Sequence, residues 1–191
     1  MSPLDALFVS TFAVAVAEIG DKTQLLALLL AARYRKPWPI VAGILLATLL
    51  NHALAAWFGA ALSEWLPAGV LRWLVAGSFL AIALWTLRPD RLEEDERRKA
   101  GPGGAFLATL VAFFLAEIGD KTQVATVLLA AKYEALAQVI AGTTLGMLVA
   151  NIPVVVLGAR FAERLPLRAA RIAAALLFLA LAAWVAWRGI G

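Results

Sequence analysis

The sequence contains no cysteine and a single histidine among its 191 residues. The absence of cysteine excludes disulfides, thiolate metal sites and cysteine nucleophiles, so any metal ligands must be oxygen atoms or the one imidazole. Charged residues are scarce, at 16%, whereas 63% of the residues are hydrophobic and the mean hydropathy is +0.85. Lysine and arginine outnumber the acids by 17 to 13, but no basic stripe marks a nucleic-acid surface. This composition predicts an integral membrane protein surrounded by the lipid bilayer, with no nucleic-acid partner.

Long apolar runs dominate the chain, and six of them could cross a hydrocarbon core of about 30 Å as helices of about 20 residues. They lie near residues 4–32, 38–61, 69–88, 105–131, 135–159 and 168–188. Because lipid offers the backbone no hydrogen bonds, we expect an all-α integral membrane fold of six transmembrane helices. No basic residue precedes the first apolar run and no small-residue cleavage site follows it, so we expect this span to stay in the mature chain.

A polar octet interrupts the first and the fourth of these runs. It reads Ala-Glu-Ile-Gly-Asp-Lys-Thr-Gln and occurs unchanged at residues 17–24 and 116–123. Both runs are too long for one straight span, since a helix over residues 4–32 would exceed about 40 Å at about 1.5 Å per residue. Gly20 and Gly119 lie near the middle of the two runs, so we expect a bend at each octet.

The octets belong to two copies of one three-helix plan. Residues repeated 99 positions apart include the pairs Gly43 and Gly142, Gly59 and Gly158, Glu64 and Glu163, and Trp85 and Trp184. We therefore divide the chain into a first repeat (1–88), a charged linker (89–104) and a second repeat (105–191). Because three is an odd number, the second repeat enters the membrane from the opposite side, which makes the two repeats inverted.

The basic residues outside the octets predict the orientation of the chain. Twelve of them lie on the side of the linker and three lie on the other side. The positive-inside rule then places the linker in the cytoplasm and both termini outside, in a multi-pass protein of the inner (plasma) membrane. We interpret the linker as a solvated hinge, with a regulatory or partner-binding loop as the alternative.

Six charged side chains of the octets lie inside apolar runs, where each costs about 2.5 to 3.5 kcal/mol on insertion scales. They are Glu18, Asp21, Lys22, Glu117, Asp120 and Lys121. A purely structural set of salt bridges is the weaker interpretation, because buried ion pairs seldom improve on apolar packing. On a continuous helix the acids and the lysine of one octet would share a face, followed by Gln24 or Gln123.

Inversion would bring the two octets face to face, so that four carboxylates converge. Burial and nearby like charges both favour protonated carboxylates, so the cluster should hold protons until a cation replaces them. This competition, combined with alternating exposure to either side, is a minimal mechanism for cation:proton antiport. Carboxylate and amide oxygens suit Ca²⁺, Mg²⁺ or Mn²⁺ better than copper or zinc. Lys22 and Lys121 would offset two of the four charges, or act as tethered cations in the empty site.

Three more polar residues lie in the second helices of the two repeats, two in the first repeat and one in the second. Asn51 and Asn151 could supply carbonyl oxygens to the site or fix helix packing through a hydrogen bond, and the sequence favours neither. His52 has Ile152 as its counterpart. We interpret it as an ordinary interhelical histidine, with a proton-relay or ligand role as the alternative.

Two E-x-G-D-K-T motifs, at residues 18–23 and 117–122, in a six-span chain with a charged central loop closely resemble the Ca²⁺:cation antiporter-2 family. The resemblance covers the whole chain. It implies divalent-cation transport coupled to protons, of the bacterial manganese-exporter type. It also implies the following site: Glu18, Asp21, Glu117 and Asp120 as cation ligands, with Thr23 and Thr122 in support. Gln24 and Gln123 join the proposed ligands on their spacing alone.

We therefore expect a secondary transporter rather than an enzyme. Its substrates would be protons and a divalent cation, Mn²⁺ or Ca²⁺, and it would need no permanent cofactor. A passive cation channel and an exporter of small cationic organic solutes remain alternatives. An intramembrane enzyme with paired carboxylates is disfavoured, because the sequence shows no separate polar pocket for a substrate. The sequence leaves a homo-oligomer open.

Overall fold

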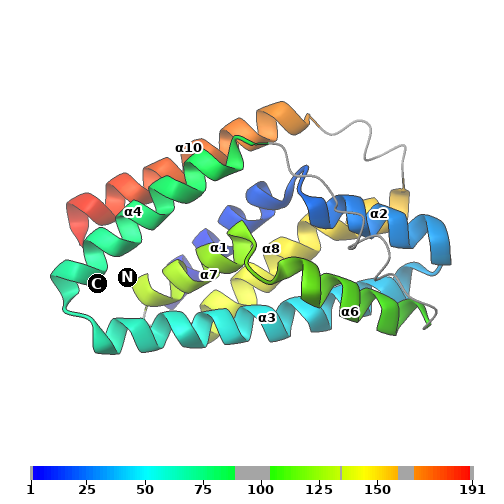
Figure 1. Ribbon diagram of the computed structural model, residues 1–191, viewed down its shortest axis with the longest axis horizontal. Helices are drawn as coiled ribbons and strands as arrows, with labels where there is room; N and C mark the ends of the chain where they lie inside the picture. The colour runs from blue at the N-terminus through cyan, green and yellow to red at the C-terminus, as the bar shows by residue number, and fades with distance from the viewer. Residues whose placement is uncertain (1, 89–103, 134, 159–165, 190–191) are drawn as a thin grey trace.

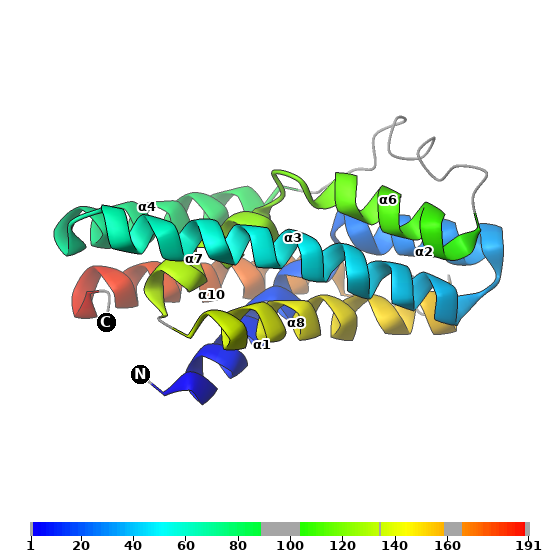
Figure 2. The same ribbon diagram turned by 90° about the horizontal axis from the view of Figure 1, so that it is seen from below.

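The computed structural model describes residues 2–88, 104–133, 135–158 and 166–189, so the linker lies outside the described residues apart from Gly104. All the secondary structure within these ranges is helical, as the sequence predicted. The helices are α1 (Pro3–Glu18), α2 (Lys22–Tyr34), α3 (Pro37–Trp65), α4 (Ala68–Thr86), α6 (Ala105–Glu117), α7 (Lys121–Lys132), α8 (Leu136–Leu157) and α10 (Leu167–Arg188). They form an elongated bundle whose helices run mainly along its long axis (Figures 1 and 2).

Local sequence explains where several helices begin. Ser2 and Asp5 form a capping box, in which each side chain accepts a hydrogen bond from the other residue's backbone N–H. Pro3 and Pro37 occupy the first positions of α1 and α3, where the missing N–H costs no helical hydrogen bond. Helices α1 and α3 therefore begin at residues that favour helix starts.

Each octet breaks its helix. Gly20 has a φ of +82° and Gly119 a φ of +76°, which are backbone conformations that favour glycine. The axes of α1 and α2 consequently meet at 70°. The predicted bend is thus confirmed, but the continuous helix assumed for the spacing argument is wrong. Glu18 is the last residue of α1, and Asp21 is the cap that precedes α2.

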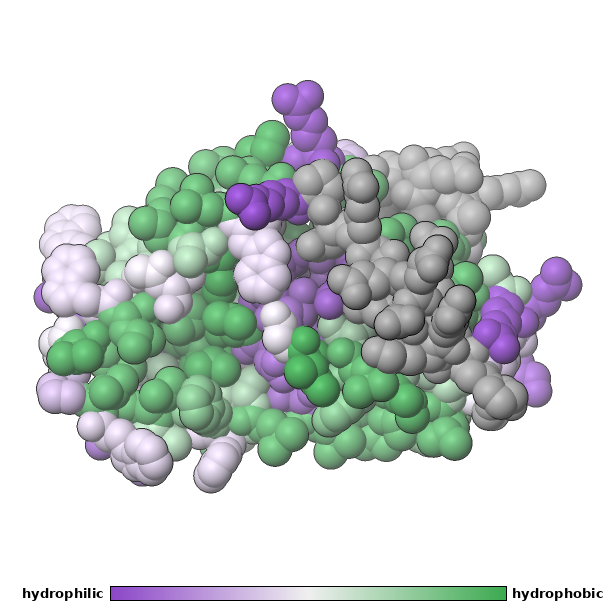
Figure 3. Space-filling view, viewed as in Figure 1, coloured by the Kyte–Doolittle hydropathy of each residue, from purple (hydrophilic) through white to green (hydrophobic). Residues whose placement is uncertain are grey.

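By length and composition, α3, α4, α8 and α10 are the helices of the described chain that could each cross a membrane, and α1 with α2 adds a fifth if counted as one bent span. The run expected over residues 105–131 is divided into α6 and α7, each too short to span alone. The large side chains exposed to the surroundings are mostly apolar, and Figure 3 shows them over most of one face. A surface this apolar fits lipid rather than water.

The first helix of each half packs on the long second helix of the other half, α1 on α8 and α6 on α3. Both contacts are close. A Cβ added to Gly43 would lie 2.8 Å from the carbonyl oxygen of Phe106, and one added to Gly142 would lie 2.5 Å from that of Leu7. Since Leu7 and Phe106 are themselves 99 residues apart, the two interfaces are copies of one another.

The last helices of the two halves, α4 and α10, lie side by side along one edge of the bundle (Figure 1). Phe79 of α4 and Phe178 of α10 occupy equivalent positions in the repeats, and their rings stack with centroids 6.2 Å apart. The start of α1 and the end of α10 lie at the same end of the bundle. One helix of each broken pair lies against this edge pair, α1 on α10 and α7 on α4.

Candidate cation site

Three buried carboxylates from both halves of the chain meet where the helices break. Glu18, Glu117 and Asp120 each offer one oxygen, and these oxygens lie within 4.8 Å of one another. Both glutamates are wholly buried and Asp120 is 3% exposed. Three oxygens at this separation are close enough to ligate one cation, so three of the four carboxylates that were expected to converge lie together in the structure.

Each glutamate has one oxygen held by the threonine of its own octet. The hydroxyl of Thr23 donates to Glu18 Oε2, and that of Thr122 donates to Glu117 Oε2 at 3.2 Å. The other oxygen, Oε1, of each glutamate is buried and has no hydrogen-bond partner among the described residues. A buried carboxylate oxygen without a donor is costly, and either a proton or a cation would remove that cost.

The aspartates and lysines pair across the two repeats. Lys121 donates to Asp21, and this pair is almost fully buried. The mirror pair is looser, since Lys22 Nζ lies 4.0 Å from Asp120 Oδ1 and 19% of the lysine side chain is exposed. Asp120 also accepts hydrogen bonds from the N–H and the hydroxyl of Thr122, at 3.2 and 3.0 Å.

The two glutamines of the octets stabilise the helix breaks. Gln24 Oε1 accepts from the N–H of Gly20 at 2.8 Å, and Gln123 Oε1 accepts from the N–H of Gly119 at 2.7 Å. The amide nitrogen of Gln24 also donates to the carbonyl of Ala150 in α8 at 2.9 Å. In this conformation both carbonyl oxygens face the glycine amides of their own octets.

The polar residues of the second helices are buried beside the octets. Asn51 donates to the carbonyl of Phe114 in α6, at 3.0 Å, and so ties α3 to the helix that carries Glu117. Asn151 donates to the carbonyl of Met147 in its own helix, and its side-chain oxygen has no partner among the described residues. His52 is wholly buried, with neither ring nitrogen bonded within those residues.

Sequence reasoning did not find the backbone groups that position this site. The carbonyls of Phe114 and Ala150 anchor an asparagine and a glutamine. Both belong to apolar residues, whose side chains carry no signal for such a role. Only the break in the helices and the contact between repeats, which are properties of the folded chain, bring these groups into place.

The charges at the site leave room for one divalent cation. The four octet acids carry four formal negative charges, and the two octet lysines offset two of them. Burial makes an uncompensated charge expensive, so the remaining two charges require protons or a cation. The atoms that these acids offer to a metal are carboxylate oxygens, which suit hard divalent ions.

A family model described as "Divalent cation/proton antiporter GDT1" matches residues 6–94 and 105–191. A Vibrio cholerae protein named "Putative manganese exporter" is 53% identical over 180 residues, which cover 94% of this chain and 89% of that protein. "GDT1-like protein 3" of Arabidopsis thaliana is 28% identical over 204 residues, covering 93% of this chain and 69% of the relative. The indica rice protein of the same name is also 28% identical, over 200 residues, covering 92% and 71%. No solved structure matches the chain.

Proposed function

The chain belongs to the divalent cation/proton antiporter GDT1 family, and from this premise we propose that it exports Mn²⁺ from the cytoplasm in exchange for protons. The family consists of transporters, in agreement with the expectation that the chain is not an enzyme. Manganese is the first candidate because the relative with 53% identity carries the name of a manganese exporter. Ca²⁺ is the second candidate, since the same oxygen donors suit both ions.

The convergence of Glu18, Glu117 and Asp120 carries this proposal. The three acids come from both repeats and are buried, with one oxygen of each glutamate unpaired within the described chain. We assign these three acids as the ligands in this conformation, with Asp21 as the fourth acid of the site. Thr23 and Thr122 orient the glutamates. Gln24 and Gln123 stabilise the helix breaks by accepting hydrogen bonds from the N–H groups of Gly20 and Gly119.

Exchange follows from the cost of burying these carboxylates as anions. Without a cation the glutamates take up protons, which removes the repulsion between them. A divalent cation that enters the cluster displaces those protons and compensates the same two charges. Proton and cation therefore occupy the site in turn, and the site is exposed to one side of the membrane with the cation and to the other side with protons.

We propose that the six predicted spans form two inverted repeats, with α1–α2 and α6–α7 as the broken first span of each. The stacking of Phe79 on Phe178 supports this arrangement, because a residue that contacts its own repeat mate lies on the axis relating the repeats. The start of α1 and the end of α10 lie at one end of the bundle, as an even number of crossings requires. The distribution of the basic residues supports an orientation with that end outside.

The experiment that tests this function reconstitutes the purified protein in liposomes and follows internal Mn²⁺ and internal pH together. Opposite fluxes of Mn²⁺ and protons are expected. The Glu18→Gln and Glu117→Gln variants should each lose both fluxes, because an amide cannot release a proton to the cation. Asp5→Asn, a carboxylate-to-amide change at the exposed start of α1, serves as the matched control and should retain both fluxes.

The two flux signals also separate the alternatives. Metal flux that moves no protons would indicate a passive channel. If the protein moves neither Mn²⁺ nor protons but transports a cationic organic solute, Mn²⁺ is not its substrate. Retention of both fluxes in the two glutamine variants would show that the buried glutamates are not the site.

A further inference from the structure

Gly59 brings two helices of opposite repeats into backbone contact. A Cβ added to this residue in α3 would lie 2.1 Å from the carbonyl oxygen of Val127 in α7, and 3.0 Å from its Cα. No side chain fits at position 59 while the helices are this close, because the obstacle is backbone rather than the end of a flexible side chain. At this point α3 is helical and continues to Trp65.

Within the described residues, the equivalent contact in the other repeat is absent. Gly158 and Leu28 are the residues 99 positions away from Gly59 and Val127. No atom of the described residues, Leu28 included, lies within 4 Å of a Cβ added to Gly158. Gly158 has a φ of +72° and ends α8, whereas Gly59 lies inside a helix. The same position in the two repeats therefore has two conformations, one packed and one open.

Other features of the described chain differ between the repeats in the same way. The edge helix α4 contacts α7, but its equivalent α10 makes no comparable contact with α2. Consequently Leu25 of α2 is 41% exposed, whereas its repeat mate Val124 of α7 packs against a buried apolar cluster. The lysine–aspartate pairs are likewise unequal, one close and one at 4.0 Å.

The differences do not extend to every interface. The contacts of Gly43 with α6 and of Gly142 with α1 are close in both repeats. The pairs α3–α6 and α8–α1 are thus equivalent. What differs is how α7 and α2 meet the second helices, and which helix meets the edge pair, since α7 contacts α4 whereas α1 rather than α2 contacts α10. The two glycine interfaces at Gly43 and Gly142 are thus alike, whereas the contact at Gly59 is closed and the equivalent position, Gly158, is not packed by the described residues. This pattern is expected of a transporter in one of two related conformations.

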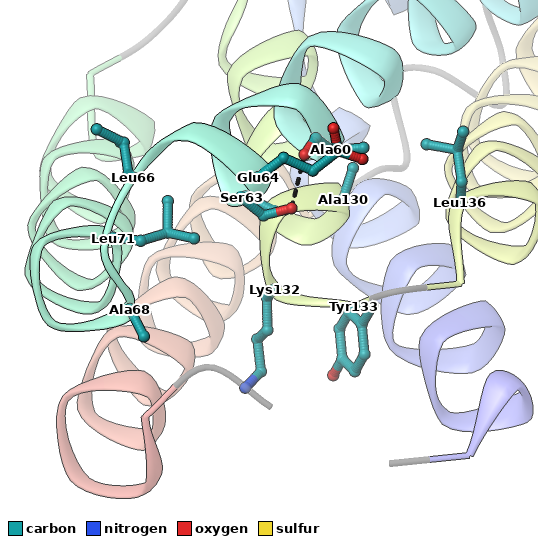
Figure 4. Close-up of a pocket in the computed structure, with 11 residues that line it drawn as sticks. Ala60, Ser63, Glu64, Leu66, Ala68, Leu71, Ala130, Lys132, Tyr133 and Leu136 are labelled. Carbon is teal, nitrogen blue, oxygen red and sulfur yellow. Dashed lines mark hydrogen bonds between the residues drawn. The ribbon is translucent and has the colours of Figure 1, made fainter.

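A cavity of about 410 Å³ lies directly beyond the closed contact. Residues of α3 and α7 that line it, among them Ala60, Glu64 and Lys132, follow Gly59 and Val127 toward the ends of their helices (Figure 4). The buried carboxylates lie on the other side of the contact, at the start of α7. The Gly59–Val127 contact consequently stands between this cavity and the cation site.

We propose that Gly59 and Gly158 are the two positions at which α3–α7 and α2–α8 close in alternation. In this structure Gly59 closes the end of the site that faces the cavity, and at the opposite end no described residue packs on Gly158. In the other state α2 packs its backbone on Gly158, and α7 leaves Gly59. This inference rests on the proposed function, since it assigns the positions that control access to that cation site.

The cysteine-free chain permits a direct test with single-cysteine probes. Val124→Cys reports access at the Gly59 end and Leu25→Cys reports access at the Gly158 end, because the two positions are repeat mates. A membrane-impermeant thiol reagent is added to one side of oriented vesicles at a time. In the wild-type background the Leu25→Cys probe should react from the Gly158 side, and the Val124→Cys probe should be protected.

Gly59→Ala is the variant that separates the states. Its added Cβ prevents the α3–α7 contact, so we expect labelling of Val124→Cys to rise about tenfold and labelling of Leu25→Cys to fall correspondingly. Gly43→Ala is the matched control, because its Cβ also meets a backbone carbonyl but at an interface that both repeats share. It should lower thermal stability and leave the ratio of the two labelling rates unchanged.

Equal labelling ratios in Gly59→Ala, Gly43→Ala and wild type would overturn the proposal. If Gly59→Ala does not fold, spin labels on Ser63→Cys in α3 and Ala130→Cys in α7 give a second measurement on the otherwise unchanged chain. Two distance populations whose proportions change with Mn²⁺ and pH are expected; one fixed distance would contradict the proposal. Metal and proton fluxes measured in the same vesicles distinguish this failure from failure of the proposed function, which would abolish flux in the wild type as well.

Discussion

Replacing Lys121 with methionine should destabilise the protein far more than the same change at its repeat mate, Lys22. Lys121 is the buried partner of Asp21, and 4% of its side chain is exposed. Removal of one member of a buried ion pair costs about 3 to 5 kcal/mol, because the other charge stays behind uncompensated. Lys22 is 19% exposed and lies 4.0 Å from Asp120, so its loss should cost less than the loss of Lys121.

Thermal unfolding in detergent, with a chelator present, measures this difference. For a chain of this size about 1 kcal/mol corresponds to about 2 to 4 °C, so Lys121→Met should lower the Tm by about 6 °C or more. Lys22→Met should lower it by clearly less than Lys121→Met does. Adding Asp21→Asn to Lys121→Met should recover most of the loss, because the buried charge is then gone.

Mn²⁺ provides the second part of this test. Without Lys121, the carboxylate of Asp21 can join the other acids, so Mn²⁺ should raise the Tm of Lys121→Met more than that of the wild type. Binding at about 100 times the Kd adds about 2.7 kcal/mol of stability. Equal Tm losses for the two lysine variants, or no extra stabilisation of Lys121→Met by Mn²⁺, would refute the reasoning.

Three further predictions follow from the site and its helix breaks. Gly20→Ala and Gly119→Ala each force a side chain into a left-handed conformation at a cost of about 1 to 2 kcal/mol. Gly20→Ala should cost more, because its Cβ would also lie 3.0 Å from Cδ2 of Leu167. The Tm values of the two variants measure the difference. Thr122→Val removes a hydroxyl that contacts both Glu117 and Asp120, and calorimetry should show Mn²⁺ affinity weakened by about tenfold, which corresponds to about 1.4 kcal/mol. Lowering the pH should weaken Mn²⁺ binding in the wild type, since protons and the cation compete for the same carboxylates; an affinity constant between pH 8 and pH 5.5 would contradict this.

The sequence predicted the helices well because lipid-facing segments are recognisable by composition alone. The expected boundaries of the long helices lie within a few residues of α3, α4, α8 and α10. The bends at Gly20 and Gly119 were also predictable, since glycine beside polar residues is a poor continuation for an apolar helix. Helix breaks of this kind are local properties of the chain.

Three of the four acids that the sequence predicted to converge do meet, but the geometry of their cluster was not predictable. An identical octet in each repeat identified the acids, yet the helical spacing invoked to bring Glu18 and Asp21 together was wrong, because the helix ends between them. The identical octets also gave no reason to expect unequal lysine pairs. The unequal contacts at Gly59 and Gly158 depend on how whole helices pack, which the two matching glycines alone do not specify.

The central claim is that protons and one divalent cation share the carboxylates contributed by both repeats. Its most direct test is proton release on Mn²⁺ binding, measured with a pH indicator in weakly buffered detergent solution of purified protein. Mn²⁺ should release protons from the wild type, and Glu18→Gln and Glu117→Gln should each release fewer and bind Mn²⁺ more weakly. Mn²⁺ binding without proton release, or undiminished release in both variants, would contradict the claim.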